Sequence, residues 1–226
     1  MTIKLHCFGE SGNAYKAALT LALAGQDWEP VYVDFFNGET RSDAFRELNI
    51  MGEVPVMEDG DVILTQSGVM QDYIAEKSGK FGGKDAAERR EVLRWVLWDN
   101  HKMSSQAGMT RFLMNFLPED KRPEQVIGFM QGRLAGAYAT LDADSSVRVI
   151  VITGAGRAFC AGADISNGFA SSGFDEAPSV HDGVQRDTGG ELVLDMFNIN
   201  TPIIGAINGA AVGIGATMTL PMDLRI

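Results

Sequence analysis

The order of apolar and polar positions over residues 1–80 predicts short strands that alternate with helices. A β-rich run from Ile3 to Phe8 precedes a loop, and residues 14–24, rich in Ala and Leu, favour a helix. The elements expected next are a strand at 29–35, a short helix at 42–48, a hairpin of 56–58 and 62–65 about Asp59-Gly60, and a helix at 67–77. The order is βαβαββα, which predicts an α/β fold class. Val54-Pro55, ahead of the hairpin, is a candidate cis peptide bond that would expose the backbone groups of Val54.

The rest of the chain predicts helices first and two buried strands afterwards. Residues 84–142 carry apolar stripes at helical spacing, broken by a loop that Pro118 and Pro123 bracket. Apolar strands are expected at 147–153 and 203–207, and each ends at a glycine-rich turn. The small-residue segment at 210–216 follows the second turn, so this part of the chain predicts a ββα fragment. Such turns let backbone N–H groups converge on a ligand, so the pair could bind a developing oxyanion.

A stretch without charged residues between Asp195 and Asp223 could be mistaken for a membrane span. Three of its glycines follow the small-xxx-small spacing of packed membrane helices. Asparagines and two prolines within the stretch suit a buried strand, a turn and a helix better. We therefore expect no membrane segment.

Composition and charge exclude several classes of protein. The 226 residues include 45% hydrophobic and 22% charged residues, as in ordinary globular chains, and the net charge of -11 argues against nucleic acid as a partner. Cys7 and Cys160 are too few for a disulfide framework or a zinc site, so no metal is expected. Cys7 is interpreted as a buried small hydrophobe, and His6 and His101 as structural or surface residues. Nothing at the N-terminus indicates a signal peptide, so a reducing cytoplasm is the default location.

Residues 1 to about 80 resemble the thioredoxin-like domain of a glutathione S-transferase. Three separated motifs carry the resemblance, each at its expected place in one βαβαββα unit: Ser11-Gly12-Asn13-Ala14-Tyr15-Lys16, Val54-Pro55 and Gln66-Ser67. The resemblance implies that glutathione is bound as a substrate and that its thiolate is conjugated to small electrophiles.

The same resemblance implies a role for each motif. Ser11 would donate a hydrogen bond to the glutathione sulfur and favour the thiolate, with Asn13 as the second-choice donor. Ser67 and the N-terminus of its helix would hold the γ-glutamyl carboxylate, and Gln66 could add a contact. Val54 would pair its backbone with the cysteinyl unit like an added strand. The alternative for the serines and Asn13 is a purely structural role in turns and helix caps.

Residues 84–142 resemble the start of the helical second domain of the same family, and cover about half of such a domain. We therefore expect a thioredoxin-like glutathione-binding domain at 1–80, a partial helical transferase domain at 81–143, and a different segment at 144–226.

The segment at 144–226 resembles the crotonase superfamily of enoyl-CoA hydratases and isomerases. The resemblance is carried by IVITGAGRAFCAGAD, from Ile150 to Asp164, and by NGAAVGIG, which begins at Asn208. It implies a coenzyme A thioester as a ligand, with an oxyanion hole for its enolate formed by the N–H groups of Ala163 and Ile214.

The departures from that superfamily bear on its chemistry. Thr217 stands where hydratases carry their first catalytic glutamate, and it cannot act as a carboxylate base. The position of the second glutamate lies beyond Ile226, and the strands that precede residue 147 in the superfamily are missing. Enoyl-CoA hydratase activity is therefore not expected. Cys160, Asp164 and His181 are interpreted as scaffold or loop residues.

The chain therefore resembles the first part of a glutathione transferase joined to an internal crotonase fragment, with the join expected within residues 139–145. Three hypotheses stay open: a glutathione-binding protein with transferase activity, which is favoured; an acyl-CoA-binding or acyl-CoA-converting protein; and an inactive hybrid. Whether the fusion is natural, engineered or misassembled stays open as well. Small-molecule ligands are the expected partners, with self-association through residues 144–226 because their apolar faces lack cover.

Overall fold

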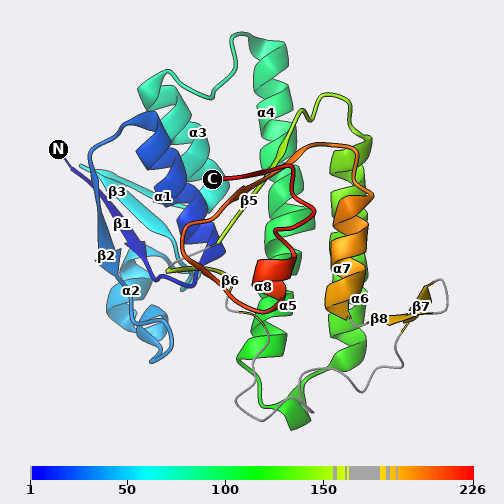
Figure 1. Ribbon diagram of the computed structural model, residues 1–226. Helices are drawn as coiled ribbons and strands as arrows, with labels where there is room; N and C mark the ends of the chain where they lie inside the picture. The colour runs from blue at the N-terminus through cyan, green and yellow to red at the C-terminus, as the bar shows by residue number, and fades with distance from the viewer. Residues whose placement is uncertain (1, 155–156, 161, 163–178, 182–183, 187) are drawn as a thin grey trace. The chain divides into compact units, whose positions relative to one another are not determined.

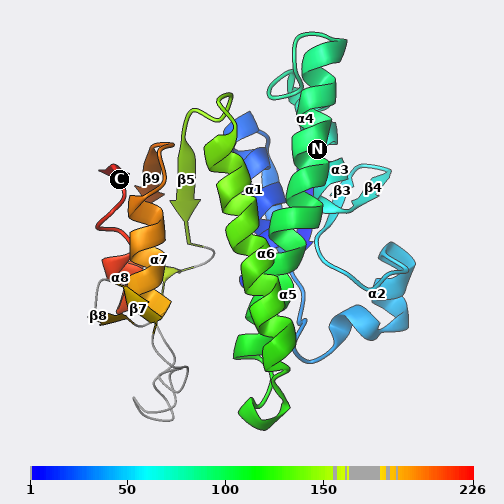
Figure 2. The same cartoon turned by 90° about the vertical axis from the view of Figure 1, so that its right-hand side faces the viewer.

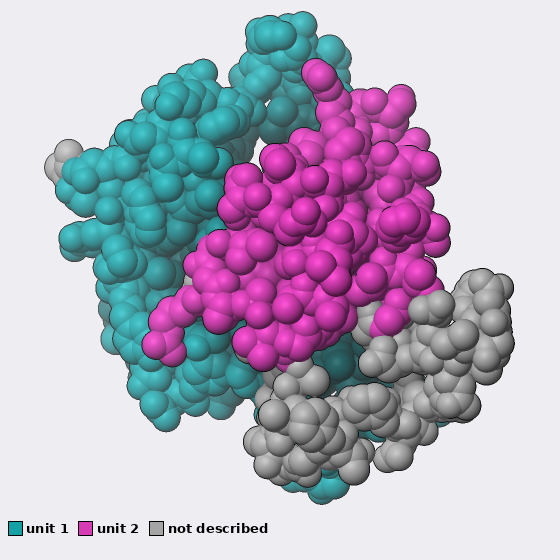
Figure 3. Space-filling model, viewed as in Figure 1, with its two compact units in different colours: residues 1–137 teal, residues 138–226 magenta. Residues whose placement is uncertain are grey.

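A computed structural model describes residues 2–154, 157–160, 162, 179–181, 184–186 and 188–226 (Figure 1). The chain divides into two compact units, residues 1–137 and residues 138–226 (Figure 3).

The first unit begins with strands and helices in the predicted order. They are β1 (Ile3–Cys7), α1 (Gly12–Ala24), β2 (Trp28–Tyr32), α2 (Asp43–Leu48), β3 (Val56–Asp59), β4 (Val62–Thr65) and α3 (Ser67–Ser78), with a 3-10 turn at Glu39–Arg41. The predicted βαβαββα order and the α/β fold class are confirmed. Local signals account for the boundaries: α1 starts at its N-cap Ser11 and ends at Gly25 in the left-handed conformation, which glycine adopts at little cost.

The sheet of the first unit has the strand order β2-β1-β3-β4. β1 pairs parallel with β2 and antiparallel with β3, and β3 forms the predicted hairpin with β4. Neighbouring residues of β3 pack on opposite faces, as the period of a strand requires. Met57 packs with the apolar residues of α1 and α3, and Val56 packs with Phe45 of α2. Helices α1 and α3 therefore share one face of the sheet, where the larger core lies.

The remaining helices of the first unit follow the expected pattern. They are α4 (Ala86–Trp98), a π-helical turn (Asp99–Ser104), α5 (Ser105–Asn115), a 3-10 turn (Glu119–Lys121) and α6 (Glu124–Ala143), whose last residues belong to the second unit. Figure 2 shows α4 continuing into α5 through the π-turn. The π-turn was not foreseen, because its sequence carries no break. Among the described residues, no helix is long and apolar enough to cross a bilayer.

In its described residues, the second unit combines short strands, most of them in parallel pairs, with the helices α7 and α8. Its elements are β5 (Ile150–Thr153), β6 (Ala158–Cys160), β7 (Ser179–His181), β8 (Val184–Arg186), α7 (Thr188–Phe197), β9 (Ile203–Ala206), β10 (Ala210–Ala211), α8 (Ile214–Thr217) and β11 (Leu224–Arg225). β9 lies between β11 and β5 in a parallel sheet, and β6 pairs parallel with β10. The core gathers the buried residues Ile150, Phe159, Met196, Ile203 and Met222.

Two expectations for this unit need correction. The strand expected from residue 147 begins at Ile150, because Asp144 organises a turn: its carbonyl accepts from the Val147 N–H at 2.9 Å and its carboxylate from the Ser146 N–H at 2.9 Å. The small-residue segment at 210–216 forms a two-residue strand before its helix, since Gly213, with φ of 57°, separates β10 from α8.

Candidate functional site

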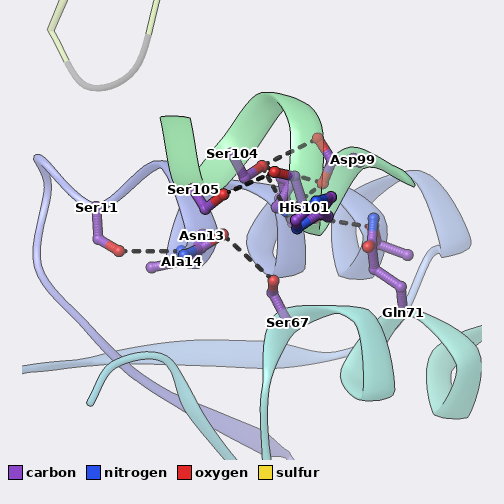
Figure 4. A network of polar contacts seen from close by, with 11 residues as sticks. Ser11, Asn13, Ala14, Ser67, Gln71, Asp99, His101, Ser104 and Ser105 are labelled. Atoms are coloured by element: carbon purple, nitrogen blue, oxygen red, sulfur yellow. Dashed lines mark hydrogen bonds and ion pairs between the residues drawn. The ribbon is translucent and has the colours of Figure 1, made fainter. Parts of the chain in front are cut away.

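The N-termini of α1 and α3 lie side by side in the first unit. The hydroxyl of Ser11, the N-cap of α1, accepts a hydrogen bond from the Ala14 N–H at 3.2 Å. The Ser67 hydroxyl, at the start of α3, donates to the side-chain oxygen of Asn13 at 3.5 Å (Figure 4). Ser67 is buried, at 5% exposed. The structure therefore brings three of the residues singled out from the sequence to two adjoining helix ends.

The loop ahead of β3 is connected to the same helix end. The Val54–Pro55 peptide bond is cis, as the sequence suggested. Directly before it, the Glu53 carboxylate accepts a hydrogen bond from the Gln66 side-chain amide at 3.1 Å. Glu53 was not singled out from the sequence, although its place next to Val54-Pro55 was a usable signal. Gln66 is thus joined to the cis-proline loop by a side-chain contact.

The backbone of Gln66 is unusual. Its φ of 69° is a left-handed conformation that a non-glycine residue adopts at a cost of about 1–3 kcal/mol. Gln66 is the N-cap of α3, yet its side chain makes no capping hydrogen bond and contacts Glu53 instead. The conformation turns the chain from the end of β4 at Thr65 straight into α3.

Both helix ends have an electrostatic character that suits an anion. A helix N-terminus carries a partial positive charge and N–H groups without intrahelical acceptors. Neither α1 nor α3 has an acidic residue in its first turn. The charge at these ends is therefore not neutralised by the helices' own first turns, and a carboxylate or thiolate would be stabilised there.

Two other residues of the first unit that could take part in chemistry, Cys7 and His6, have partners within the fold. Cys7 packs against the core under α1, and burial raises the pKa of its thiol, so the reactive thiolate is disfavoured. His6 has a partner that the sequence did not show, since strand pairing places its Nε2 atom 2.5 Å from the Glu58 carboxylate. Within the described residues, no group of three or more His, Cys, Asp or Glu is placed to hold a metal ion.

In the second unit, the two glycine-rich turns meet. β5 and β9 run parallel with Thr153 opposite Ala206, so both strands end at one edge of the sheet. The Gly154 N–H, after β5, donates to the side-chain oxygen of Asn208, after β9, at 3.0 Å. The two glycine-rich turns that the sequence predicts, after β5 and after β9, are therefore in contact.

Close backbone contacts explain two glycines of this region. A Cβ atom on Gly162, whose φ is 83°, would lie 2.6 Å from the Val212 carbonyl oxygen. A Cβ atom on Gly215 would lie 2.5 Å from the carbonyl oxygen of Cys160, in β6. Only glycine lets these segments approach so closely.

The predicted oxyanion-hole pair is described only in part. Ile214 begins α8, whereas Ala163 and Asp164 lie outside the described residues, as does the side chain of His181. The pair therefore stays a prediction. Thr217 is exposed at the end of α8, where its hydroxyl donates to the Ile214 carbonyl at 3.3 Å.

Comparisons with known families match the two parts of the chain separately. Residues 1–76 match the glutathione S-transferase N-terminal domain, and residues 128–226 match the enoyl-CoA hydratase/isomerase family. The second match begins within α6, ahead of the join expected within residues 139–145.

Individual proteins give the same division. An enoyl-CoA hydratase of Alternaria alternata is 49% identical over 88 residues, which make up 39% of this chain and 28% of that protein. The crystal structure of a glutathione transferase from Pseudomonas putida, with glutathione disulfide bound, matches with a TM-score of 0.58 and 22% identity over 62% of this chain and 64% of that one. A Burkholderia graminis glutathione transferase with two glutathione molecules bound matches with a TM-score of 0.58 and 22% identity, covering 62% of this chain and 61% of that one.

The chain thus spans less than a third of the Alternaria hydratase and under two thirds of these transferase chains. The likeness to solved transferases shows the fold, and it reaches beyond the share that residues 1–76 alone supply. Both resemblances seen in the sequence are confirmed: the chain carries a glutathione S-transferase N-terminal domain at residues 1–76 and an enoyl-CoA hydratase/isomerase segment at residues 128–226.

Proposed function

We propose that the chain binds glutathione in its thioredoxin-like domain, at residues 1–80, and conjugates the glutathione thiolate to small electrophiles. The observation that carries the proposal is the Ser67–Asn13 contact, which places the N-termini of α1 and α3 together next to the cis-proline loop. The fold is that of transferases whose structures hold glutathione or its disulfide. Residues 81–143 would form a partial helical domain beside it.

The two charged groups on the α-carbon of the γ-glutamyl unit would each face an opposite charge in this arrangement. Its carboxylate would accept hydrogen bonds from the Ser67 hydroxyl and from N–H groups at the start of α3. Its ammonium group would face the Glu53 carboxylate, which Gln66 already contacts. Glu53 is thereby added to the binding residues that the sequence suggested.

The cysteinyl unit would pair with Val54. Within the described part of the chain, the backbone N–H and C=O groups of Val54 have no hydrogen-bond partner. An extended peptide could satisfy both groups at once, as an added strand does. Pro55, which is buried, separates Val54 from the first residue of β3.

Ser11 would act on the sulfur. Its hydroxyl oxygen accepts from the Ala14 N–H, which leaves the hydroxyl hydrogen for donation to a thiolate. That hydrogen bond stabilises the charged form, so the thiol proton passes to solvent more readily. The sulfur electron pair then forms a carbon–sulfur bond, and the leaving group of the electrophile departs with its bonding electrons.

Calorimetric titration with glutathione tests the proposal. The wild-type chain should bind, and Ser67→Ala should lower the affinity by about 10-fold or more, because a hydrogen bond to a charged group is lost. Ser78→Ala, at the other end of α3, is the matched control and should leave the affinity unchanged. If Ser67→Ala and Ser78→Ala bind equally well, the carboxylate site is misplaced.

A second candidate function is the binding of an acyl-CoA by the hydratase/isomerase segment. The meeting of the glycine-rich turns at Gly154 and Asn208 favours it, since the oxyanion hole expected from the sequence requires such turns. Thr217 supplies no carboxylate base, so binding without hydration is the expected result. Titration with a short enoyl-CoA measures its binding, and a separate assay measures its hydration. Robust hydration by pure protein would contradict this view of Thr217.

We place the protein in a reducing compartment such as the cytoplasm. Cys7 and Cys160 are both free thiols, which such a compartment maintains.

A further inference from the structure

A polar stripe on α1 faces a polar stripe on α3. Asn13, Lys16 and Thr20 are three and then four residues apart, a spacing that places them on one face of α1. One turn beyond the Ser67–Asn13 contact, the Gln71 amide of α3 donates to the Thr20 hydroxyl at 3.3 Å. The Thr20 hydroxyl in turn donates to the Lys16 carbonyl at 2.8 Å. Polar contacts therefore join α1 and α3 at two levels behind the candidate site.

Lys16 is held from a third element, the π-turn. Its Nζ atom lies 2.5 Å from an Asp99 carboxylate oxygen and 2.8 Å from the Ser104 hydroxyl. The Ser104 hydroxyl also lies 2.9 and 3.0 Å from the two Asp99 oxygens (Figure 4). The side chains of Lys16, Asp99 and Ser104 therefore all contact one another. The Lys16 and Asp99 side chains are only 22% and 33% exposed, which limits screening of their charges.

The π-turn explains how one segment supplies both acceptors. Asp99 and Ser104 are five residues apart, and in an α-helix of 3.6 residues per turn such side chains point in different directions. The wider π-turn, with its i→i+5 hydrogen bonds, brings them to one side. π-turns are rare and often occur at functional sites. The local change from α-helix to π-turn therefore lets Asp99 and Ser104 contact Lys16 together.

We propose that the Lys16–Asp99 pair acts on the charge of the glutathione sulfur from behind Ser11: Asp99 and Ser104 hold the Lys16 ammonium group in place, and the opposite charges of the pair offset each other at the sulfur. This inference rests on the proposed glutathione site. Lys16 follows Ser11 by five residues, about 7.5 Å along the helix axis at 1.5 Å per residue. Over such a distance a partly shielded charge still acts on a thiolate. Ser11 remains the residue that touches the sulfur.

Other titratable groups lie on neighbouring turns and must stay constant in a test. They are Glu10, His101 and Lys102 of the neighbouring turns, and Arg111 of α5, which donates to the Glu10 carbonyl at 2.6 Å. Variants of Lys16 and Asp99 leave all four in place. A change in the thiol's titration can then be assigned to the pair.

The experiment measures the pKa of the bound glutathione thiol from its ultraviolet thiolate absorbance. Lys16→Met leaves the Asp99 charge unbalanced and should raise this pKa by about 0.5 units. Asp99→Asn keeps an acceptor for Lys16 but frees its positive charge, so the pKa should fall by about the same amount. The double variant removes both charges and should return to the wild-type value. Lys16→Gln, which keeps a donor for Asp99, replaces Lys16→Met if that variant does not fold.

Lys84→Met is the matched control, because Lys84 precedes α4 and lies about 20 Å along that helix from Asp99. It should leave the pKa of the thiol unchanged. If both single variants raise the pKa, the pair only supports Ser11 structurally and the inference is wrong; an absence of any shift also overturns it. A wild-type chain that does not bind glutathione would instead overturn the proposed function, and this inference with it.

Discussion

Glu53 and Gln66, thirteen residues apart in the chain, are joined by a hydrogen bond of 3.1 Å from the Gln66 amide to the Glu53 carboxylate. The contact places a negative charge between the cis-proline loop and the start of α3. A ligand with a carboxylate and an ammonium group on the same carbon would find both counterparts here, at the helix end and at Glu53.

The Glu53 assignment predicts a dependence on the amino group of glutathione. Glu53→Gln should weaken glutathione binding by about 10-fold or more, since a charge-assisted hydrogen bond is lost. An analogue without the γ-glutamyl amino group should bind wild type and Glu53→Gln equally. Calorimetry with both ligands measures this. Equal losses for the two ligands would show that Glu53 supports the loop without contacting the ammonium group.

Ser11 should affect the thiol more than binding. Ser11→Ala removes the hydroxyl that would donate to the sulfur, so the pKa of the bound thiol should rise and conjugation of a small aromatic electrophile near pH 7 should slow by about 10-fold or more. Ser11 is also the N-cap of α1, and its loss should cost about 1 kcal/mol of stability. Ser11→Gly, which costs only a few tenths of a kcal/mol at a cap, separates the two effects. Unchanged conjugation in both variants would leave Ser11 as a cap alone.

Asp142 should make the second unit sensitive to acid. Its carboxylate accepts hydrogen bonds from the Thr201 and Asn200 N–H groups, each at 2.8 Å, and these hold the pKa of Asp142 below its usual range. A lowered folded-state pKa contributes stability above the unfolded value of about 3.9, and this is lost as the pH falls through the folded value. Asp142→Asn should therefore unfold at lower denaturant than wild type at pH 7, and the difference should shrink below about pH 4.

Denaturant unfolding at several pH values measures this effect. Asp61→Asn, on the exposed turn between β3 and β4, is the control and should follow wild type throughout. A difference between Asp142→Asn and wild type that stays constant down to pH 2 would mean that the charge of Asp142 is not what stabilises the fold.

The second unit should mediate self-association. Among the described strands, β5 lies at the edge of its sheet, and Val151 on it is 57% exposed. Other large apolar residues of the unit, such as Phe197 and Leu220, are exposed as well. Exposed apolar edges form contacts between molecules, and the net charge of -11 is screened in salt. Light scattering in about 0.15 M salt should show association that Val151→Lys reduces. Val62→Lys, on edge strand β4 of the first unit, should not; the reverse result would place the contact in the first unit.

Local signals in the sequence predicted most of the first unit. Asp59-Gly60 marked the hairpin, and the Ala-rich segment after Ser11 marked α1, because turn and helix preferences act between residues close in the chain. β6 and β10 were missed for the opposite reason. Each has three residues or fewer, and their pairing joins residues some fifty positions apart.

The sequence by itself determined the order of elements in residues 1–80, the cis-proline candidate, the helix caps, and the two families that share the chain. Only the tertiary structure decided which side chains meet: Ser67 with Asn13, Glu53 with Gln66, and Lys16 with Asp99. Backbone preferences depend on a few neighbouring residues, whereas these contacts depend on how helices and loops pack against a common sheet. The π-turn also belongs to what only the tertiary structure decided, since its residues suit a plain α-helix and its wider form is seen where Asp99 and Ser104 both contact Lys16.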